Sequence, residues 1–252
     1  MEHRVRINFG GAALVLALGI AASVITSTAV ASHAFRARAR DAHRREQEIS
    51  VKGSARTRVR SDLAVWHIEV RGEAKELQPA FEALDTGVGR VRAFLTERGF
   101  SASEVAIGPI DTATFYARDD KGRDTREVTG YALTRSFTVS TGSVGRAASA
   151  AAEVTQLLRE GVKVASTRPA FYYTKLPDLK VQILGDASRD AKARADEIAH
   201  NSGSRVAEVR HAQMGVIQIT EPNSTETSGG GMYDTSTIEK DVSVVTLTLG
   251  LG

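Results

Sequence analysis

The side chains best suited to metal binding or acid–base chemistry are spread thinly along this sequence. Zinc and iron sites need three or four nitrogen, sulfur or oxygen ligands at one point. No two histidines stand three or four residues apart, as ligands on one helix face would, and His67 falls on the polar side of an alternating segment. We therefore predict no metal site. The histidines are His3, His33, His43, His67, His200 and His211.

Nucleophilic catalysis also lacks a signature in this sequence. Neither the G-x-S-x-G elbow nor the S-x-x-K motif of serine nucleophiles occurs. The chain has no cysteine, so no thiol of its own can act as a nucleophile, a redox couple or a metal ligand. We predict no catalytic residue, no cofactor-binding residue and no cofactor, and hence a protein that is not an enzyme.

Two loops carry residue types that bind ligands in other proteins. Asp119, Asp120 and Asp124 lack the spacing of a calcium loop, and the charges around them are typical of a solvated hairpin tip. The glycines at 229–231 are not followed by Lys-Ser or Lys-Thr, which favours a loop over a phosphate cradle. The sequon at 223–225 predicts that this loop is exposed.

The N-terminal region contains one long uncharged segment, residues 7–32. As a helix it would reach about 39 Å, enough to cross the apolar core of a bilayer. Arg4 and Arg6 before it, and the small residues at 29–31, are typical of a signal peptide, but the apolar run is longer than usual for one. We therefore predict a transmembrane anchor in residues 1–34. Cleavage near Ala31, leaving a soluble periplasmic protein, is the alternative.

We predict a basic stalk or linker in residues 35–47, between this leader and the domain that follows. The positive-inside rule, applied to its arginines alone, would place the C-terminal side in the cytoplasm. The same arginines could meet lipid headgroups, or the segment could be a solvated stalk helix. The arginines are Arg36, Arg38, Arg40, Arg44 and Arg45.

The basic residues are concentrated near the N-terminus. Residues 1–60 carry 11 basic and 4 acidic side chains, and the remaining 192 residues carry 22 and 26. A nucleic-acid-binding domain carries its own basic face, whereas this one is mildly acidic. We predict no nucleic-acid partner.

Hydrophobic periodicity in residues 48–252 predicts one α+β domain, with a mostly antiparallel sheet, about three helices and the order ββαββαβαββ. Residues 63–175 alone give the βαββαβ order of ferredoxin-like domains. The expected strands are 49–59, 63–71, 105–117, 127–141, 163–175, 205–220 and 237–250; the expected helices are 77–95, 143–161 and 178–203.

The apolar residues of each helix predict its buried face. Gly87 and Gly89 weaken the middle of the first helix. The predicted buried residues are Leu77, Phe81, Leu84, Val88, Val91 and Leu95 in the first helix; Val144, Ala147, Ala148, Ala151, Val154, Leu157 and Leu158 in the second; and Leu184, Ala187, Ala191, Ala195 and Ile198 in the third.

Several short segments of the domain stand in a distinctive order and spacing. They are residues 49–53 (ISVKG), 61–66 (SDLAVW), 174–180 (TKLPDLK), 186–192 (DASRDAK), 201–205 (NSGSR), 213–216 (QMGV) and 238–245 (IEKDVSVV). Together they resemble the bacterial SIMPL-domain family over roughly residues 48–250. The resemblance implies an exported or inner-membrane-anchored envelope protein. Some family members are linked to oxidative-stress defence and some self-associate; none supplies catalytic residues to carry over.

We expect a single-pass inner-membrane protein, in contact with the bilayer through residues 7–32 and with its C-terminal domain in the periplasm. The resemblance supports that orientation against the arginine count. The leading hypothesis is a domain that acts through contacts with unknown envelope proteins, in envelope or oxidative-stress tolerance. A self-assembling structural homo-oligomer is one alternative, and an enzyme or small-ligand binder with an unrecognised site is another.

Overall fold

The computed structural model describes residue 32, residues 49–206 and residues 209–251. The predicted anchor and stalk thus lie outside the described residues, apart from Ser32. Within the described part of the chain, no helix is both long enough and apolar enough to cross a membrane. The larger of two compact units holds residues 53–190 and 214–247, and the sites discussed below lie in it.

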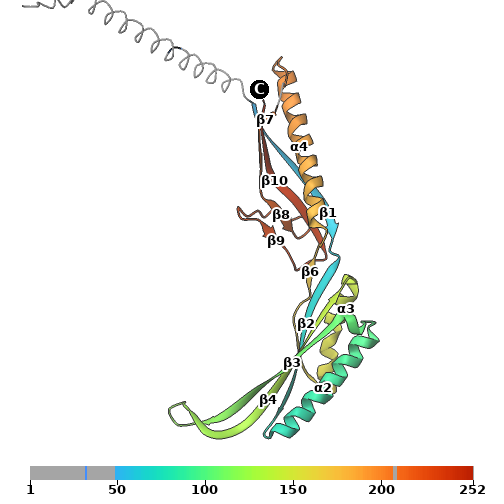
Figure 1. The fold of residues 1–252 in the computed structure, drawn as a ribbon, viewed down its shortest axis with the longest axis vertical. Coiled ribbons are helices and arrows are strands. Elements are labelled where there is room, and N and C mark those ends of the chain that lie inside the picture. Colours follow the sequence, from blue (N-terminus) through green and yellow to red (C-terminus); the bar gives the residue numbers. More distant parts are fainter. Residues whose placement is uncertain (1–31, 33–48, 207–208, 252) are drawn as a thin grey trace, which may run out of the picture. The chain divides into compact units, whose positions relative to one another are not determined.

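The α+β class is confirmed, with mostly antiparallel pairing in two sheets (Figure 1). The described residues form three α-helices, α2 (Leu77–Glu97), α3 (Val144–Glu153) and α4 (Leu176–Asn201), and two 3-10 segments, η1 (Ala102–Glu104) and η2 (Val154–Glu160). The strands are β1 (Ile49–Arg60), β2 (Leu63–Ala74), β3 (Val105–Arg118), β4 (Asp124–Thr141), β5 (Lys163–Ser166), β6 (Ala170–Tyr172), β7 (Val209–Met214), β8 (Ile217–Thr220), β9 (Met232–Tyr233) and β10 (Glu239–Leu251).

The predicted order of elements is correct for the helices but too simple for the strands. The segment expected as one strand at 163–175 is two short strands, β5 and β6, which both pair with β2. The segment at 205–220 is divided at Gly215 into β7 and β8. The two-residue strand β9 was not predicted, because the glycines at 229–231 marked its surroundings as loop.

The first sheet, which we call the β2 sheet, has the strand order β3-β4-β2-β5. Its neighbouring strands are all antiparallel, which is the arrangement expected of a ferredoxin-like βαββαβ segment. Strand β1 precedes β2 directly but belongs to the other sheet, the β10 sheet, with order β1-β10-β8-β9. Asp62 lies in the link between β1 and β2, where the chain passes from one sheet to the other. Its carboxylate accepts hydrogen bonds from the amide (2.7 Å) and hydroxyl (2.9 Å) of Thr174.

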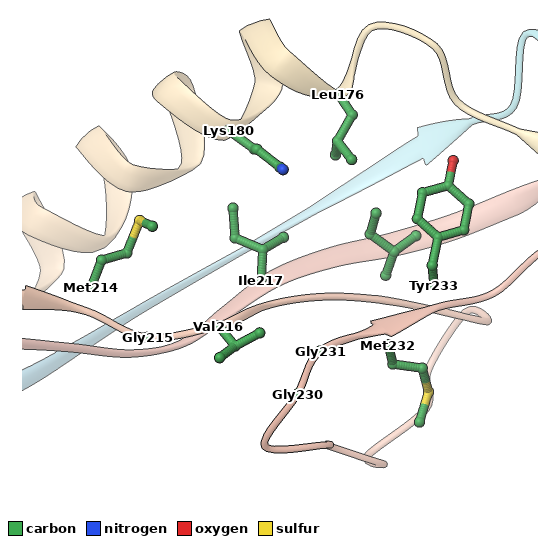
Figure 2. Close-up of a pocket in the computed structure, with 11 residues that line it drawn as sticks. Leu176, Lys180, Met214, Gly215, Val216, Ile217, Gly230, Gly231, Met232 and Tyr233 are labelled. Carbon is green, nitrogen blue, oxygen red and sulfur yellow. The ribbon is translucent and has the colours of Figure 1, made fainter.

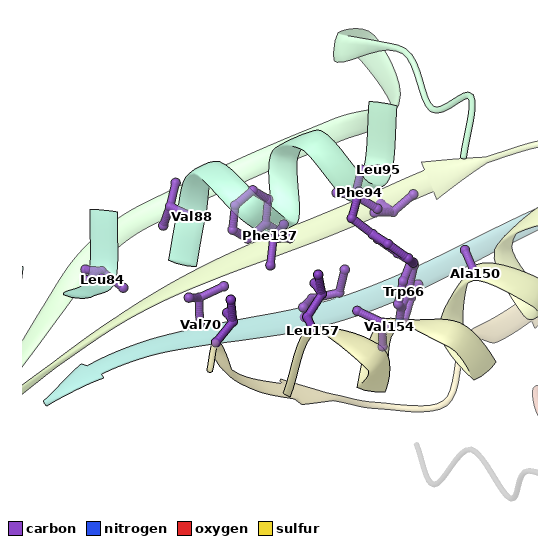
Figure 3. Close-up of a cluster of buried hydrophobic side chains, with 14 of the residues drawn as sticks. Trp66, Val70, Leu84, Val88, Phe94, Leu95, Phe137, Ala150, Val154 and Leu157 are labelled. Carbon is purple, nitrogen blue, oxygen red and sulfur yellow. The ribbon is translucent and has the colours of Figure 1, made fainter. Parts of the chain in front are cut away.

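The core of the β2 sheet is apolar and rich in aromatic side chains. The alternation of β2 buries Trp66, Ile68 and Val70 completely, as the sequence predicts. Phe137 on β4 stands opposite Ile68 in the register. Side chains of α2, α3 and η2 complete this cluster (Figure 3).

Two glycines bring α2 unusually close to β2. A Cβ atom on Gly72 would lie 2.2 Å from the Ala80 carbonyl oxygen, and one on Gly87 would lie 2.7 Å from a methyl of Val70. Gly87, which weakens the helix by propensity, therefore allows close packing. Because the helix approaches at Ala80, the predicted face is wrong at its start. Leu77 and Phe81 are about half exposed.

The second predicted helix changes character after ten residues. The α-helical part, α3, ends at Glu153 and continues as the 3-10 segment η2, which is closed by Gly161 at φ 81°. Val154 and Leu157 remain buried as predicted, but the tighter winding turns Leu158 outward, to 51 % exposed. Ala148 and Ala151 are only partly buried, since Ala150 takes the inward position.

Helix α4 buries a stripe of residues spaced by four. Four residues are about 40° more than one turn, so such a stripe winds slowly around the helix. The predicted face assumed the helical average of about 3.6 residues per turn and is wrong at its ends. Leu184 is only partly buried, and Ile198 is 50 % exposed. The buried residues are Leu179, Ile183, Ala187, Ala191, Ala195 and Ala199.

Candidate functional site

A groove of about 530 Å³ lies between the first turns of α4 and the strands β8 and β9 (Figure 2). We call it the α4–β8 groove. Its lining is apolar except for one lysine, Lys180. The apolar side chains that line it include Leu176, Met214, Val216, Ile217, Met232 and Tyr233.

Strand β8 positions the floor of the α4–β8 groove. It pairs with β10 on one edge, where Ile219 stands opposite Val242, and with β9 on the other, where Gln218 stands opposite Met232. Because β8 and β9 pair in parallel, a tight hairpin turn cannot join them, and the chain must return to the starting end of β8 before β9 begins. The loop at 221–231 makes this connection, and it borders the groove.

A buried glutamine fixes this loop. The Gln218 side-chain amide donates to the Ser228 carbonyl oxygen at 2.6 Å and accepts from the Ser228 amide at 3.3 Å. Gly231 then turns the chain with φ 89°, and a Cβ there would lie 3.0 Å from a methyl of Val216. The glycines expected to form a loop do so, and Gly231 also lets that loop lie against the wall of the groove.

Tyr233 closes one end of the α4–β8 groove. Its hydroxyl accepts a hydrogen bond from the Tyr173 amide at 3.1 Å, and its ring lies 6.2 Å from the ring of Tyr172. The side chain is thereby held at its tip while 41 % of it stays exposed. An apolar ring face is thus presented to the groove.

Lys180 is the one charged residue in the lining. It projects from the second turn of α4, and Figure 2 shows its ammonium directed over the groove. Nothing in residues 49–206 or 209–251 pairs with this ammonium by hydrogen bond or ion pair. The groove therefore combines apolar walls with one uncompensated positive charge.

A second lysine, Lys240, is fully buried and fully paired. Its ammonium donates to the carbonyl oxygens of Asp234 (2.6 Å) and Thr237 (2.7 Å) and to the Asp234 carboxylate (3.2 Å). Burial lowers the pKa of Lys240. Although burial acts in the opposite sense on Asp234, hydrogen bonds from Ser236 and Thr237 hold the pKa of that carboxyl well below its ordinary value. Because Lys240 uses its donors to hold this turn, we assign the cluster a structural role.

Asp241 organises the neighbouring part of the β10 sheet in the same way. Its carboxylate accepts from Arg58 Nε at 2.9 Å and from the Asn223 amide at 2.9 Å. The hydrogen bond from Arg58 lowers the pKa of Asp241. Asn223 itself is exposed, as the sequon predicts.

A two-stranded ribbon extends from the β2 sheet and presents apolar side chains. Strand β4 pairs with β2 only as far as Tyr131, so residues 115–130 pair with one another alone. We call them the β3–β4 extension. Tyr116 and Val128 are register partners in it, 44 % and 42 % exposed, and Phe115 is 42 % exposed beneath the guanidinium of Arg71.

The residues considered for chemistry from the sequence do not assemble into a site in the described parts of the chain. No group of three histidine or acidic side chains there could hold a metal ion. His67 contacts Thr138 Oγ1 at 3.1 Å, and His200 and His211 lie on α4 and β7. Asp119 accepts from Arg123 and from backbone amides within the hairpin tip, which lower its pKa.

The α4–β8 groove was not predicted from the sequence. Its parts lie between residues 176 and 233. Segments 174–180 and 213–216, which carry the family resemblance, contribute to it, but neither contains a motif typical of ligand binding. The available signal was a pair of apolar residues, Met214 and Val216, flanking Gly215 outside any regular alternation.

Comparison with known families supports the resemblance noted in the sequence. Residues 49–246 match SIMPL, a family described as protein of unknown function (DUF541). No curated protein matches the chain. Since the match covers residues from both sheets and the helices α2, α3 and α4, the chain belongs to the SIMPL family.

Proposed function

We propose that this SIMPL-family chain is a non-catalytic domain that acts by contacting other proteins through the β3–β4 extension. The observation that carries the proposal is the exposure of three large apolar side chains on this ribbon, Phe115, Tyr116 and Val128, of which Tyr116 and Val128 are register partners. Residues 115–130 pair only with one another, so the exposed aromatic side chains on this ribbon lie outside the core. A two-stranded ribbon alone also has little stability of its own. Aromatic side chains are enriched where proteins bind one another.

We place this activity in the cell envelope. The uncharged segment at 7–32 supports a membrane anchor, and the family resemblance supports a periplasmic domain and a role in envelope or oxidative-stress tolerance. In this proposal the bilayer is a partner through residues 7–32, and the β3–β4 extension contacts an envelope protein.

The test is capture of partners from crosslinked membranes by the full chain. Val128→Asp places a charge beside Tyr116 and should reduce capture of specific partners by about tenfold or more. The control is Val181→Asp, which makes the same change at a 74 % exposed site on α4. Equal capture by both variants, at normal abundance, would overturn the proposed surface.

A complementation assay tests the non-catalytic part of the proposal. A deletion strain challenged with peroxide should be rescued by alanine variants of His67, His200, His211, Asp119 and Asp120. Loss of a general base or nucleophile costs orders of magnitude in rate, whereas loss of one interface contact is graded. Complete loss of protection from one of these variants would indicate catalysis. A deletion without a phenotype would remove the stress role.

Self-assembly is the second candidate, because β3 is the end strand of its sheet. Edge strands can pair with another copy, but the β3–β4 register shifts between Ile107 and Ile110 and twice more between Phe115 and Arg118. Register shifts of this kind disfavour edge-to-edge pairing. The structure therefore favours side-chain contacts over strand addition. Light scattering of the solubilised full chain separates the two: a defined homo-oligomer lost in Val128→Asp supports self-assembly.

A further inference from the structure

We propose that the α4–β8 groove binds a single-chain amphiphile with an anionic head, of the fatty-acid class. The acyl chain would lie along the apolar walls, and the carboxylate would meet the Lys180 ammonium. This site is separate from the β3–β4 extension and does not depend on the proposed function.

The walls of the groove suit an alkyl chain. Ligand sites of about 300 to 1,000 Å³ hold small molecules, and this groove has about 530 Å³. Met214 and Val216 are 54 % and 42 % exposed, so apolar surface is available in the groove. Methionine side chains adapt to irregular apolar partners, and the lining contains two of them, Met214 and Met232.

The charge selects the head group. Lys180 is the only charged side chain in the lining, so an anion is the complementary head. Its ammonium has no partner within the described residues that it would have to give up on binding. A second cation, by contrast, would be repelled, and an uncharged head would gain a hydrogen bond at most, without the attraction between opposite charges.

Contacts within the protein hold the groove in shape. Gln218 fixes the loop at Ser228, and Tyr233 is held at its hydroxyl by the Tyr173 amide. Gly231 allows the loop to lie against Val216 without a side chain in the space between. Sites already in their binding conformation lose less entropy when a ligand binds.

Titration calorimetry of the full chain in nanodiscs of a zwitterionic lipid tests the proposal, with empty nanodiscs as the blank. Dodecanoate should bind, whereas dodecanol should bind more weakly and dodecyltrimethylammonium weakest of all. Each methylene that enters the groove should tighten binding by up to about fourfold, so decanoate should bind less tightly than dodecanoate. Equal affinity for the three head groups would overturn the assignment of Lys180.

Variants locate the bound molecule. Lys180→Glu should weaken dodecanoate binding by about fivefold or more, as expected for loss and reversal of an exposed charge pair, and Lys180→Arg should retain it. Lys192→Glu, on the same helix but outside the lining, is the charge control. Unchanged binding in Lys180→Glu would overturn the proposal.

Val216→Asp places a carboxylate in the groove wall and should abolish binding. Val128→Asp is its matched control, since both valines are 42 % exposed. Val128→Asp should leave dodecanoate binding intact, and Val216→Asp should leave partner capture intact, so failure of either proposal is seen separately. Melting temperatures close to that of the parent chain establish that each variant is folded.

A parallel titration with lauroyl lysophosphatidic acid separates two sources of an anionic head. Tighter binding of dodecanoate supports a free fatty acid as the ligand. Binding of the phosphate compound alone would overturn the fatty-acid assignment.

Discussion

The β2 sheet and the β10 sheet of this protein bury different kinds of side chain. The β2 sheet buries mostly aromatic and branched side chains such as Trp66 and Phe137, whereas the β10 sheet buries several polar and charged ones, Gln218 and Lys240 among them. Apolar burial is non-directional and tolerates many arrangements of comparable energy. Hydrogen bonds to buried groups, by contrast, specify positions. The comparison indicates that the β2 sheet supplies stability and the β10 sheet supplies a fixed geometry around the α4–β8 groove.

The largest expected effect falls on the core of the β2 sheet. Phe137→Ala removes a fully buried ring and should lower the free energy of unfolding by about 4 kcal/mol, since the cavity is enclosed by α2, β2 and η2. Urea unfolding followed by circular dichroism measures the change. Phe115→Ala, at a 42 % exposed site on β3, should cost less than about 1 kcal/mol. Similar costs for the two variants would show that the core is misidentified.

Helix α4 provides the next test, because its buried face consists largely of alanines. Ala191→Asp would bury an unpaired carboxylate and should lower the free energy of unfolding by about 3 kcal/mol. Lys192→Asp, one residue further and exposed, should change it by no more than about 0.5 kcal/mol. An unchanged melting temperature for Ala191→Asp would contradict the observed helix face.

The polar character of the β10 sheet can be tested at Lys240. Lys240→Met keeps the length of the side chain but leaves the carbonyl oxygens of Asp234 and Thr237 without their donor. We expect a loss of about 2 kcal/mol in unfolding free energy. Lys180→Met, which removes an exposed and unpaired ammonium, is the control and should be nearly neutral. A stabilising Lys240→Met would mean that apolar packing suits this position better than the ion pair.

The smallest effect concerns pH and one carboxylate at the edge of the β2 sheet. Hydrogen bonds from the Thr141 hydroxyl and the Ser101 amide lower the pKa of Glu104 from 4.5 to about 2. Because the folded-state pKa is the lower one, the stabilisation is complete above about pH 4.5 and is lost as the pH falls toward 2. Glu104→Gln should therefore be less stable than the parent at pH 6, and the difference should shrink at pH 3. Urea unfolding at both pH values measures it, and a constant difference would contradict the assignment.

Local hydrophobic periodicity predicted the buried face of a single strand or helix. The alternation of Trp66, Ile68 and Val70 identified a strand with one buried face, and the stripe from Leu84 to Leu95 identified the packed part of α2. It could not predict that Leu77 is exposed, because that depends on where Gly72 lets the helix touch the strand.

Local hydrophobic periodicity could not predict the α4–β8 groove. Nothing local distinguishes Lys240, which is buried, from Lys180, which stands over the groove. Their difference arises from residues brought near them by the fold: Asp234 and Thr237 in one case, and apolar side chains in the other.

The close approach at Gly72 has a mechanical consequence. Backbone atoms of α2 occupy the space where a side chain on β2 would stand, so no compliant side chain separates strand from helix there. Strand β2 also pairs with β4, β5 and β6. A force applied to β4 should therefore be transmitted to β2 and α2 with little deformation between them. The three elements should then unfold together rather than one after another.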